Sequence, residues 1–100
     1  MTDFEHIRFK LDDGARESLC NAVAAARRAT KSAHAANGLW VAWKALETAD
    51  PDGSFVLTSR ELYWVGKASR PEYWRDEMTM TYVMADIQRQ FNEWSMGGSK

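Results

Sequence analysis

Residues 22–36 read AVAAARRATKSAHAA, and this alanine-rich stretch decides what kind of fold the chain adopts. It contains eight alanines, and alanine has the highest helix propensity of all residues. The pattern predicts helix throughout residues 13–49. A straight helix over residues 14–49 would be about 54 Å long, whereas a globule of this size has a radius of gyration of about 13 Å. We therefore expect a break at Asn37-Gly38 (residues 37–38), because both residues tolerate the left-handed conformation that ends helices, leaving helices over 14–36 and 39–49.

The segment before this helix alternates between polar and apolar residues. Alternation over residues 4–11 predicts a short strand or extended arm within residues 1–12. Asp12 or Asp13 is placed to cap the helix that follows. Phe55-Val56-Leu57 is also β-branched and aromatic, so it is a candidate to pair with the arm as a two-stranded ribbon.

The second half of the chain contains two helix-start signals. Thr58-Ser59-Arg60-Glu61 fits the capping box, in which the first and fourth residues cap each other, and predicts a helix over 58–68. Ser69-Arg70-Pro71-Glu72 repeats this spacing and predicts a last helix over 70–95. The small and polar residues 96–100 are expected to form a frayed tail.

Together these elements predict a mainly α fold, a compact bundle of three to four helices with a short N-terminal strand or extended arm. A chain of 100 residues is expected to form a single domain. The net charge of −1 provides no overall field that would recruit nucleic acid or anionic lipid. The single cysteine, the acidic N-terminus and the lack of a long apolar run predict a cytoplasmic protein with no membrane segment.

No catalytic, cofactor or metal site is expected. Cys20 and His34 would lie about 21 Å apart along one helix, so they cannot act as a nucleophile and base. One cysteine and two histidines do not provide a zinc site. Residues 50–55 begin like a calcium loop but lack its two strongest ligand positions, so a plain turn is expected. Asp76 and Glu77 diverge by about 100° on a helix and make a poor acid–base pair.

The positive charges gather in the alanine-rich region. Arg27, Lys31 and His34 share a face by helical spacing, and Arg28 lies beside them. This pattern has two explanations that the sequence leaves open. It is either a solvated or internally paired face, with the acidic last helix as the partner, or a docking patch for an acidic protein or for nucleic acid.

The chain also has five tryptophans, which is many for its length. Tryptophan is common in cores and at protein–protein contacts, and it is rarely fully buried. The sequence does not tell which of the five are core and which are contact residues. The pattern indicates a module that acts by binding, with the oligomeric state left open.

A small domain rich in tryptophan and methionine, with acidic and basic helices and no enzyme motif, resembles in general character the anti-CRISPR inhibitors that phages encode. The resemblance implies a host protein complex as the partner, a CRISPR effector whose target DNA binding or nuclease recruitment is blocked in the bacterial cytoplasm. The alternative is a nucleic-acid-binding helical module that uses the basic helix face. The residues expected to make contact, chosen by their chemistry, are Arg27, Arg28, Lys31, Trp40, Trp64, Trp74, Asp76 and Glu77.

Overall fold

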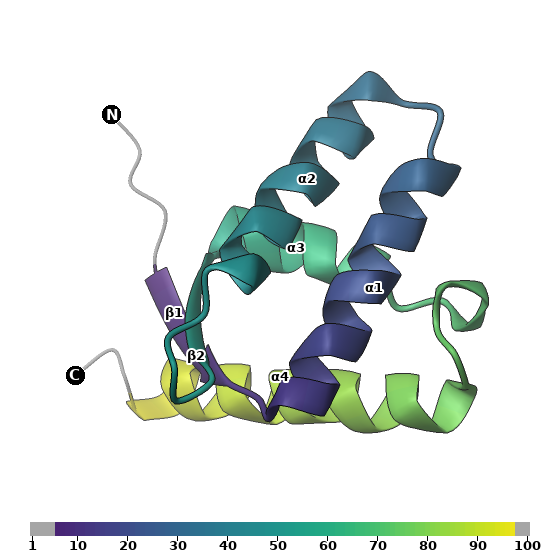
Figure 1. Cartoon of the computed structure of the whole chain (residues 1–100). Coiled ribbons are helices and arrows are strands. Elements are labelled where there is room, and N and C mark those ends of the chain that lie inside the picture. The colour runs from purple at the N-terminus through teal and green to yellow at the C-terminus, as the bar shows by residue number, and fades with distance from the viewer. Residues whose placement is uncertain (1–5, 98–100) are drawn as a thin grey trace, which may run out of the picture.

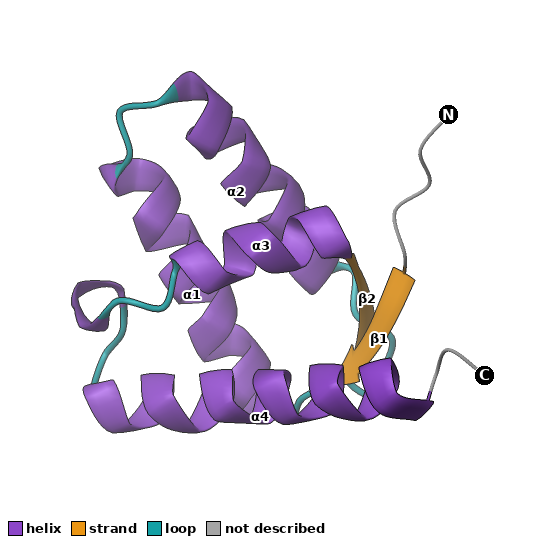
Figure 2. Ribbon diagram, turned by 180° about the vertical axis from the view of Figure 1, so that it is seen from behind, coloured by secondary structure: helices purple, strands orange, loops and turns teal. Residues whose placement is uncertain are grey.

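The computed structural model of the chain describes residues 6–97. It is mainly helical with a short two-stranded sheet, which confirms the predicted fold class (Figure 1). The elements in chain order are β1 (His6–Lys10), α1 (Asp13–Ala29), α2 (Ala33–Glu47), β2 (Ser54–Thr58), α3 (Ser59–Lys67), the 3-10 helix η1 (Pro71–Tyr73) and α4 (Glu77–Gly97). Helices α1 and α2 form a hairpin, α3 packs on α2, and α4 lies across the end of the hairpin opposite its turn (Figure 1 and Figure 2).

The two strands pair in antiparallel fashion, with Ile7 opposite Leu57 and Phe9 opposite Phe55. This pairing confirms the predicted two-stranded ribbon between the N-terminal segment and residues 55–57. Because side chains alternate across a strand, these four residues share one face, and all are buried. The Phe9 and Phe55 ring centroids are 5.9 Å apart in a stacked arrangement. The ribbon therefore closes one side of the core. Residues 1–5 of the predicted arm lie outside the described residues.

A side chain of α4 holds the outer edge of β1. The Gln90 amide nitrogen donates to the backbone oxygen of Lys10, and its amide oxygen accepts from the Lys10 backbone N–H, each at 2.9 Å. A neighbouring strand would make the same pair of bonds at this residue. Gln90 thus ties α4 to a residue 80 positions earlier in the chain.

The predicted break at residues 37–38 is wrong, because the alanine-rich segment turns earlier. Helix α1 ends at Ala29 and α2 begins at Ala33, so the turn is Thr30-Lys31-Ser32. Thr30 has an extended backbone, and the Ser32 hydroxyl caps α2 by accepting from the Ala35 N–H at 3.2 Å. Thr30 therefore ends α1 and Ser32 starts α2, which lets the two helices pack side by side.

Gly38 instead lies inside α2, where it has a packing role. A Cβ atom at this position would meet the Trp64 indole of α3 at 2.2 Å. Only glycine lets the two helices approach this closely, so the residue that the sequence suggested as a helix end is a contact point between helices.

The capping box at the start of α3 is confirmed. The Thr58 hydroxyl accepts from the Glu61 N–H at 3.1 Å, and the Glu61 carboxylate accepts from the Thr58 N–H at 2.9 Å. Helix α3 occupies residues Ser59–Lys67, within the predicted range of 58–68.

The predicted start of the last helix at residue 70 is wrong. Residues Pro71–Tyr73 form only η1, and α4 begins at Glu77. Trp74 interrupts the helix because its backbone is extended and its buried indole N–H donates to the Ala68 oxygen at 2.7 Å. The Asp76 carboxylate then caps α4 by accepting from the Thr79 N–H at 2.7 Å. The helix runs to Gly97, past the predicted end at 95 and into the tail predicted to fray; residues 98–100 lie outside the described part of the chain.

The core lies between the hairpin, the ribbon, α3 and α4. Its largest fully buried side chains are Phe9, Ile7, Leu19, Leu46, Leu57, Val23, Val65 and Val83. The radius of gyration of the Cα atoms is 13.1 Å, close to the value expected for this length. Across residues 6–97, no helix has both the length and the apolar character that crossing a membrane requires.

Candidate interaction surfaces

The structure divides the eight residues expected to make contact into three groups. Trp64 and Trp74 are each 8% exposed and belong to the core, so they offer little surface to a partner. Trp40 is 41% exposed and lies close to Arg27 and Arg28, while Lys31 lies in the turn between α1 and α2. The remaining two, Asp76 and Glu77, are exposed at the start of α4, on a separate surface.

The first surface is a groove of about 350 Å³ between the end of α1 and the middle of α2. The Lys44 ammonium lies over the Trp40 ring, 5.4 Å from its centroid. A cation at this distance is attracted by the negative face of the ring. We call this surface the basic groove and define it by Arg27, Arg28, Trp40, Trp43 and Lys44.

The cations of the basic groove have no acidic partner within residues 6–97. Neither Arg27, Arg28 nor Lys44 forms an ion pair there, and no acidic residue lines the groove. Two acids of the last helix pair locally instead, since Arg89 bridges Asp86 and Glu93. Pairing of the basic patch with the acidic last helix is therefore not seen among the described residues.

The predicted face of Arg27, Lys31 and His34 does not form, because α1 ends at Ala29. His34 lies on the other helix of the hairpin, with its ring edge-on to Trp64 at a centroid distance of 5.5 Å. The turn instead brings Trp40 and Trp43 to the two arginines. Helical spacing in the sequence relates Trp40 to Lys44, but no local pattern relates the tryptophans to Arg27 and Arg28.

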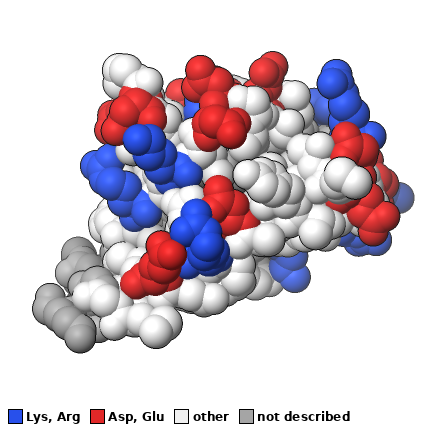
Figure 3. Space-filling model, turned by 90° about the horizontal axis from the view of Figure 1, so that it is seen from below, with Lys and Arg blue, Asp and Glu red and all other residues white. Residues whose placement is uncertain are grey.

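The second surface is formed where α1 and α4 begin. Met78 is 81% exposed and Tyr82 is 68% exposed, and both line an open groove of about 540 Å³ that includes Asp12 and Ala15 of the α1 start. Exposed carboxylates lie close by, Asp12 in the same groove and Glu17 and Asp76 in the adjoining hollow. Figure 3 shows acidic atoms, with some basic ones, beside an uncharged area on this side of the molecule. We call this surface the acidic face and define it by Asp12, Asp13, Glu17, Asp76, Glu77, Met78 and Tyr82.

The acidic face had only a partial signal in the sequence. The sequence places Met78 at helical spacing from Trp74 and Ala85, which does not decide between a core position and a contact position. Tyr82 follows Met78 by four residues and so lies on the same side of α4. Which side of α4 faces water depends on how α1 packs against it, and that packing is a long-range feature.

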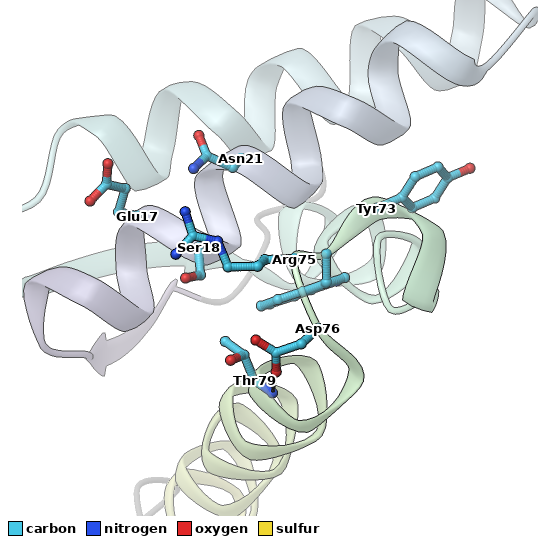
Figure 4. Close-up of a pocket in the computed structure, with 8 residues that line it drawn as sticks. Glu17, Ser18, Asn21, Tyr73, Arg75, Asp76 and Thr79 are labelled. Carbon is cyan, nitrogen blue, oxygen red and sulfur yellow. Dashed lines mark hydrogen bonds between the residues drawn. The ribbon is translucent and has the colours of Figure 1, made fainter.

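Beside the acidic face is a polar hollow of about 290 Å³ between α1 and the start of α4 (Figure 4). Glu17, Ser18 and Asn21 line it from α1, and Arg75 extends across it toward Ser18. Asp76 lies at its other side, where the hydrogen bonds from Thr79 lower the pKa of its carboxyl. Asp76 is therefore charged at neutral pH and contributes to the negative field of this face.

The one cysteine is built into the core and not into either surface. Cys20 is 4% exposed. Burial raises the pKa of its thiol to about 11, and the nearby Glu47 carboxylate adds to the rise. Within residues 6–97, no group of three or more His, Cys, Asp or Glu side chains is arranged to hold a metal ion. Cys20 is therefore not a reactive thiol, and the side chains of residues 6–97 form no metal centre.

The raised pKa predicts slow reaction of Cys20 with dithionitrobenzoate. At pH 8, about one thiol in a thousand would be ionised, and the thiolate is the reacting form. Because the folded state holds this proton more tightly, labelling is expected to stay slow up to about pH 9 and to become fast in urea. Rapid stoichiometric labelling of the folded protein at pH 8, followed by absorbance, would contradict the burial of Cys20.

The comparisons with known proteins add no assignment to these surfaces. No protein-family model matches the chain, and neither a curated protein nor a solved structure is significantly similar to it. The chemistry of the basic groove and the acidic face is therefore the basis for inferring a function.

Proposed function

We propose that this protein is a non-catalytic binding module whose acidic face docks on a basic surface of a protein complex that handles nucleic acid. The observation that carries the proposal is the exposure of Met78 and Tyr82, at 81% and 68%, among the carboxylates of the acidic face. Large apolar side chains kept in water are costly, and they are enriched where proteins make contact. Because carboxylates lie beside these two side chains, the partner is expected to carry positive charge around its apolar contact.

The chemistry of the face determines that partner. Tyrosine and methionine are enriched in the buried part of protein interfaces, whereas charged residues are found at the rim. Here the rim carries Asp13, Glu17, Asp76 and Glu77, all exposed. Arg75, which lines the neighbouring hollow with Glu17 and Asp76, is exposed as well, so the rim is predominantly and not wholly negative. A predominantly negative rim steers a partner of positive charge. A partner surface that has lysine and arginine around an apolar pocket would be complementary to both the apolar centre and the carboxylate rim of the acidic face.

The resemblance to anti-CRISPR inhibitors narrows the proposed partner to a bacterial CRISPR effector complex. Such a complex holds its target DNA in a positively charged channel. Carboxylates docked at that channel would occupy sites that otherwise bind phosphates, so the protein would compete with target DNA. We accordingly propose inhibition of DNA binding as the activity to be measured.

The test uses purified CRISPR effector complexes and a gel-shift assay of their target DNA. The protein is expected to reduce DNA binding by at least one of these effectors. The double variant Met78→Ala/Tyr82→Ala is expected to inhibit at least 30-fold more weakly, because the loss of a central contact costs about 2 kcal/mol or more. The matched control is Tyr63→Ala, since Tyr63 is also 56% exposed but lies on α3. This variant is expected to inhibit like the parent protein.

Two results would contradict the proposal, and they bear on different parts of it. If no effector loses DNA binding at any protein concentration, the partner class is wrong. If an effector is inhibited equally by the parent protein and the double variant, the acidic face is not the contact surface. Circular dichroism of each variant establishes that the helices are intact.

A further inference from the structure

We infer that the basic groove is a separate binding site for single-stranded nucleic acid. This inference goes beyond the protein-binding role proposed for the acidic face, because it concerns other residues and another class of ligand. The basic groove has more positive than negative charge. Three exposed cations, Arg27, Arg28 and Lys44, lie around a half-exposed tryptophan and have no acidic partner within residues 6–97.

A structural role of the arginines accounts for only part of this arrangement. Arg27 and Arg28 lie in the last turn of α1, where positive charge is favourable beside the helix C-terminus. That effect does not require Lys44, which belongs to another helix, or the exposed Trp40 between them. The hairpin therefore gathers more positive charge than the end of α1 needs.

The acidic face does not neutralise this charge. Glu17 is the α1 residue of the acidic face nearest to Arg27, and the two are ten positions apart, about 15 Å along the helix axis. The screening length of physiological salt is about 8 Å, so charges at this separation barely interact through solvent. The basic groove consequently attracts anions even though the whole chain has a net charge of −1.

The tryptophan favours nucleic acid over an acidic peptide. Trp40 is 41% exposed in a groove lined by Arg27 and Arg28, so a flat base can stack while its phosphate meets a guanidinium. Proteins that bind single strands without sequence preference combine these two features, an aromatic platform and a positive track. A carboxylate side chain would use the arginines but not the platform. The bases of a duplex are already stacked on each other, so a single strand is the form that fits.

The test is fluorescence anisotropy of a labelled fifteen-nucleotide oligothymidylate titrated with the full protein. With three cations engaged, raising the salt from about 50 to about 200 mM is expected to weaken binding about 20-fold. The variant Arg27→Gln/Arg28→Gln is expected to lose most of this salt dependence. Trp40→Leu is expected to bind at least fivefold more weakly, because the stacking contribution is lost.

Two controls locate the site. Arg60→Gln removes an exposed arginine of α3 that forms no ion pair within residues 6–97, and this variant is expected to bind like the parent protein. The double variant Met78→Ala/Tyr82→Ala of the acidic face is expected to bind the oligonucleotide normally. That result separates this inference from the proposed function, since either can fail without the other.

Three results would overturn the inference. The first is no change of anisotropy at the lower salt concentration. The second is binding that Arg60→Gln weakens as much as the groove variants do. The third is equally tight binding of a fifteen-residue polyglutamate peptide, which would assign the groove to acidic protein segments. Circular dichroism of each variant separates a loss of binding from a loss of folding.

Discussion

Replacing Trp64 by alanine is expected to lower the free energy of unfolding by about 3–5 kcal/mol, the largest effect of any substitution proposed for this chain. Trp64 is 8% exposed, and its ring lies edge-on to both His34 and Tyr63. Its removal would leave a cavity between α2 and α3 that the helices cannot fully close. Urea denaturation followed by far-ultraviolet circular dichroism measures the change. Such a loss is a large fraction of the total stability of a domain, which is about 5–15 kcal/mol.

Trp40→Ala is the matched control, because it removes the same side chain from a half-exposed position. We expect it to cost about 1 kcal/mol, since the ring keeps much of its surface in water and its contact with Lys44 is a single cation–π interaction. Equal losses for the two variants would contradict the assignment of Trp64 to the core and Trp40 to the surface.

The second large effect is expected for Gly38→Ala. The added Cβ would lie 2.2 Å from the Trp64 ring, and an indole cannot yield as a flexible chain end does. The two helices must separate or the ring must leave its position, and overpacking of this kind costs about 1–3 kcal/mol. Alanine is a better helix former than glycine, so helix propensity alone would stabilise the variant. A loss of stability would therefore identify the clash with Trp64 as the cause. Thermal unfolding measures the change.

Gly66→Ala provides the comparison for this prediction. Gly66 lies within α3, and a Cβ atom there would meet nothing within 4 Å. The gain in helix propensity should then appear alone, as a stabilisation of about 0.5–1 kcal/mol. If both substitutions stabilised the protein, the close approach of Gly38 and Trp64 would be refuted.

Gly38 also shows why part of the fold was predictable from the sequence and part was not. Local signals were reliable where neighbouring residues satisfy each other, as in the capping box of Thr58 and Glu61. Gly38 is ambiguous, because glycine both ends helices and permits close packing, and only the position of Trp64 decides between them. Ser32, the actual cap, is a weak signal within an alanine-rich segment that favours helix on both sides.

The candidate surfaces were predictable to a similar extent. The charges of Arg27, Arg28, Asp76 and Glu77 are properties of the sequence, so these residues could be chosen in advance. Their surroundings could not, because the turn at residues 30–32 determines which helix faces the arginines. In the same way, the burial of Trp74 follows from its hydrogen bond to Ala68, which forms only when the chain leaves its helical course.

The bond between Gln90 and the backbone of Lys10 has a consequence for how the protein is made. A ribosome synthesises β1 and the α1–α2 hairpin well before it adds residue 90, at about 5–20 residues per second. During that interval the backbone N–H and oxygen of Lys10, on the outer edge of β1, lack their hydrogen-bond partner Gln90. An unpaired strand edge can recruit another chain, so the newly made protein passes through a short period of exposure to aggregation. The arrival of α4 ends this period, because Gln90 then bonds to the backbone N–H and oxygen of Lys10.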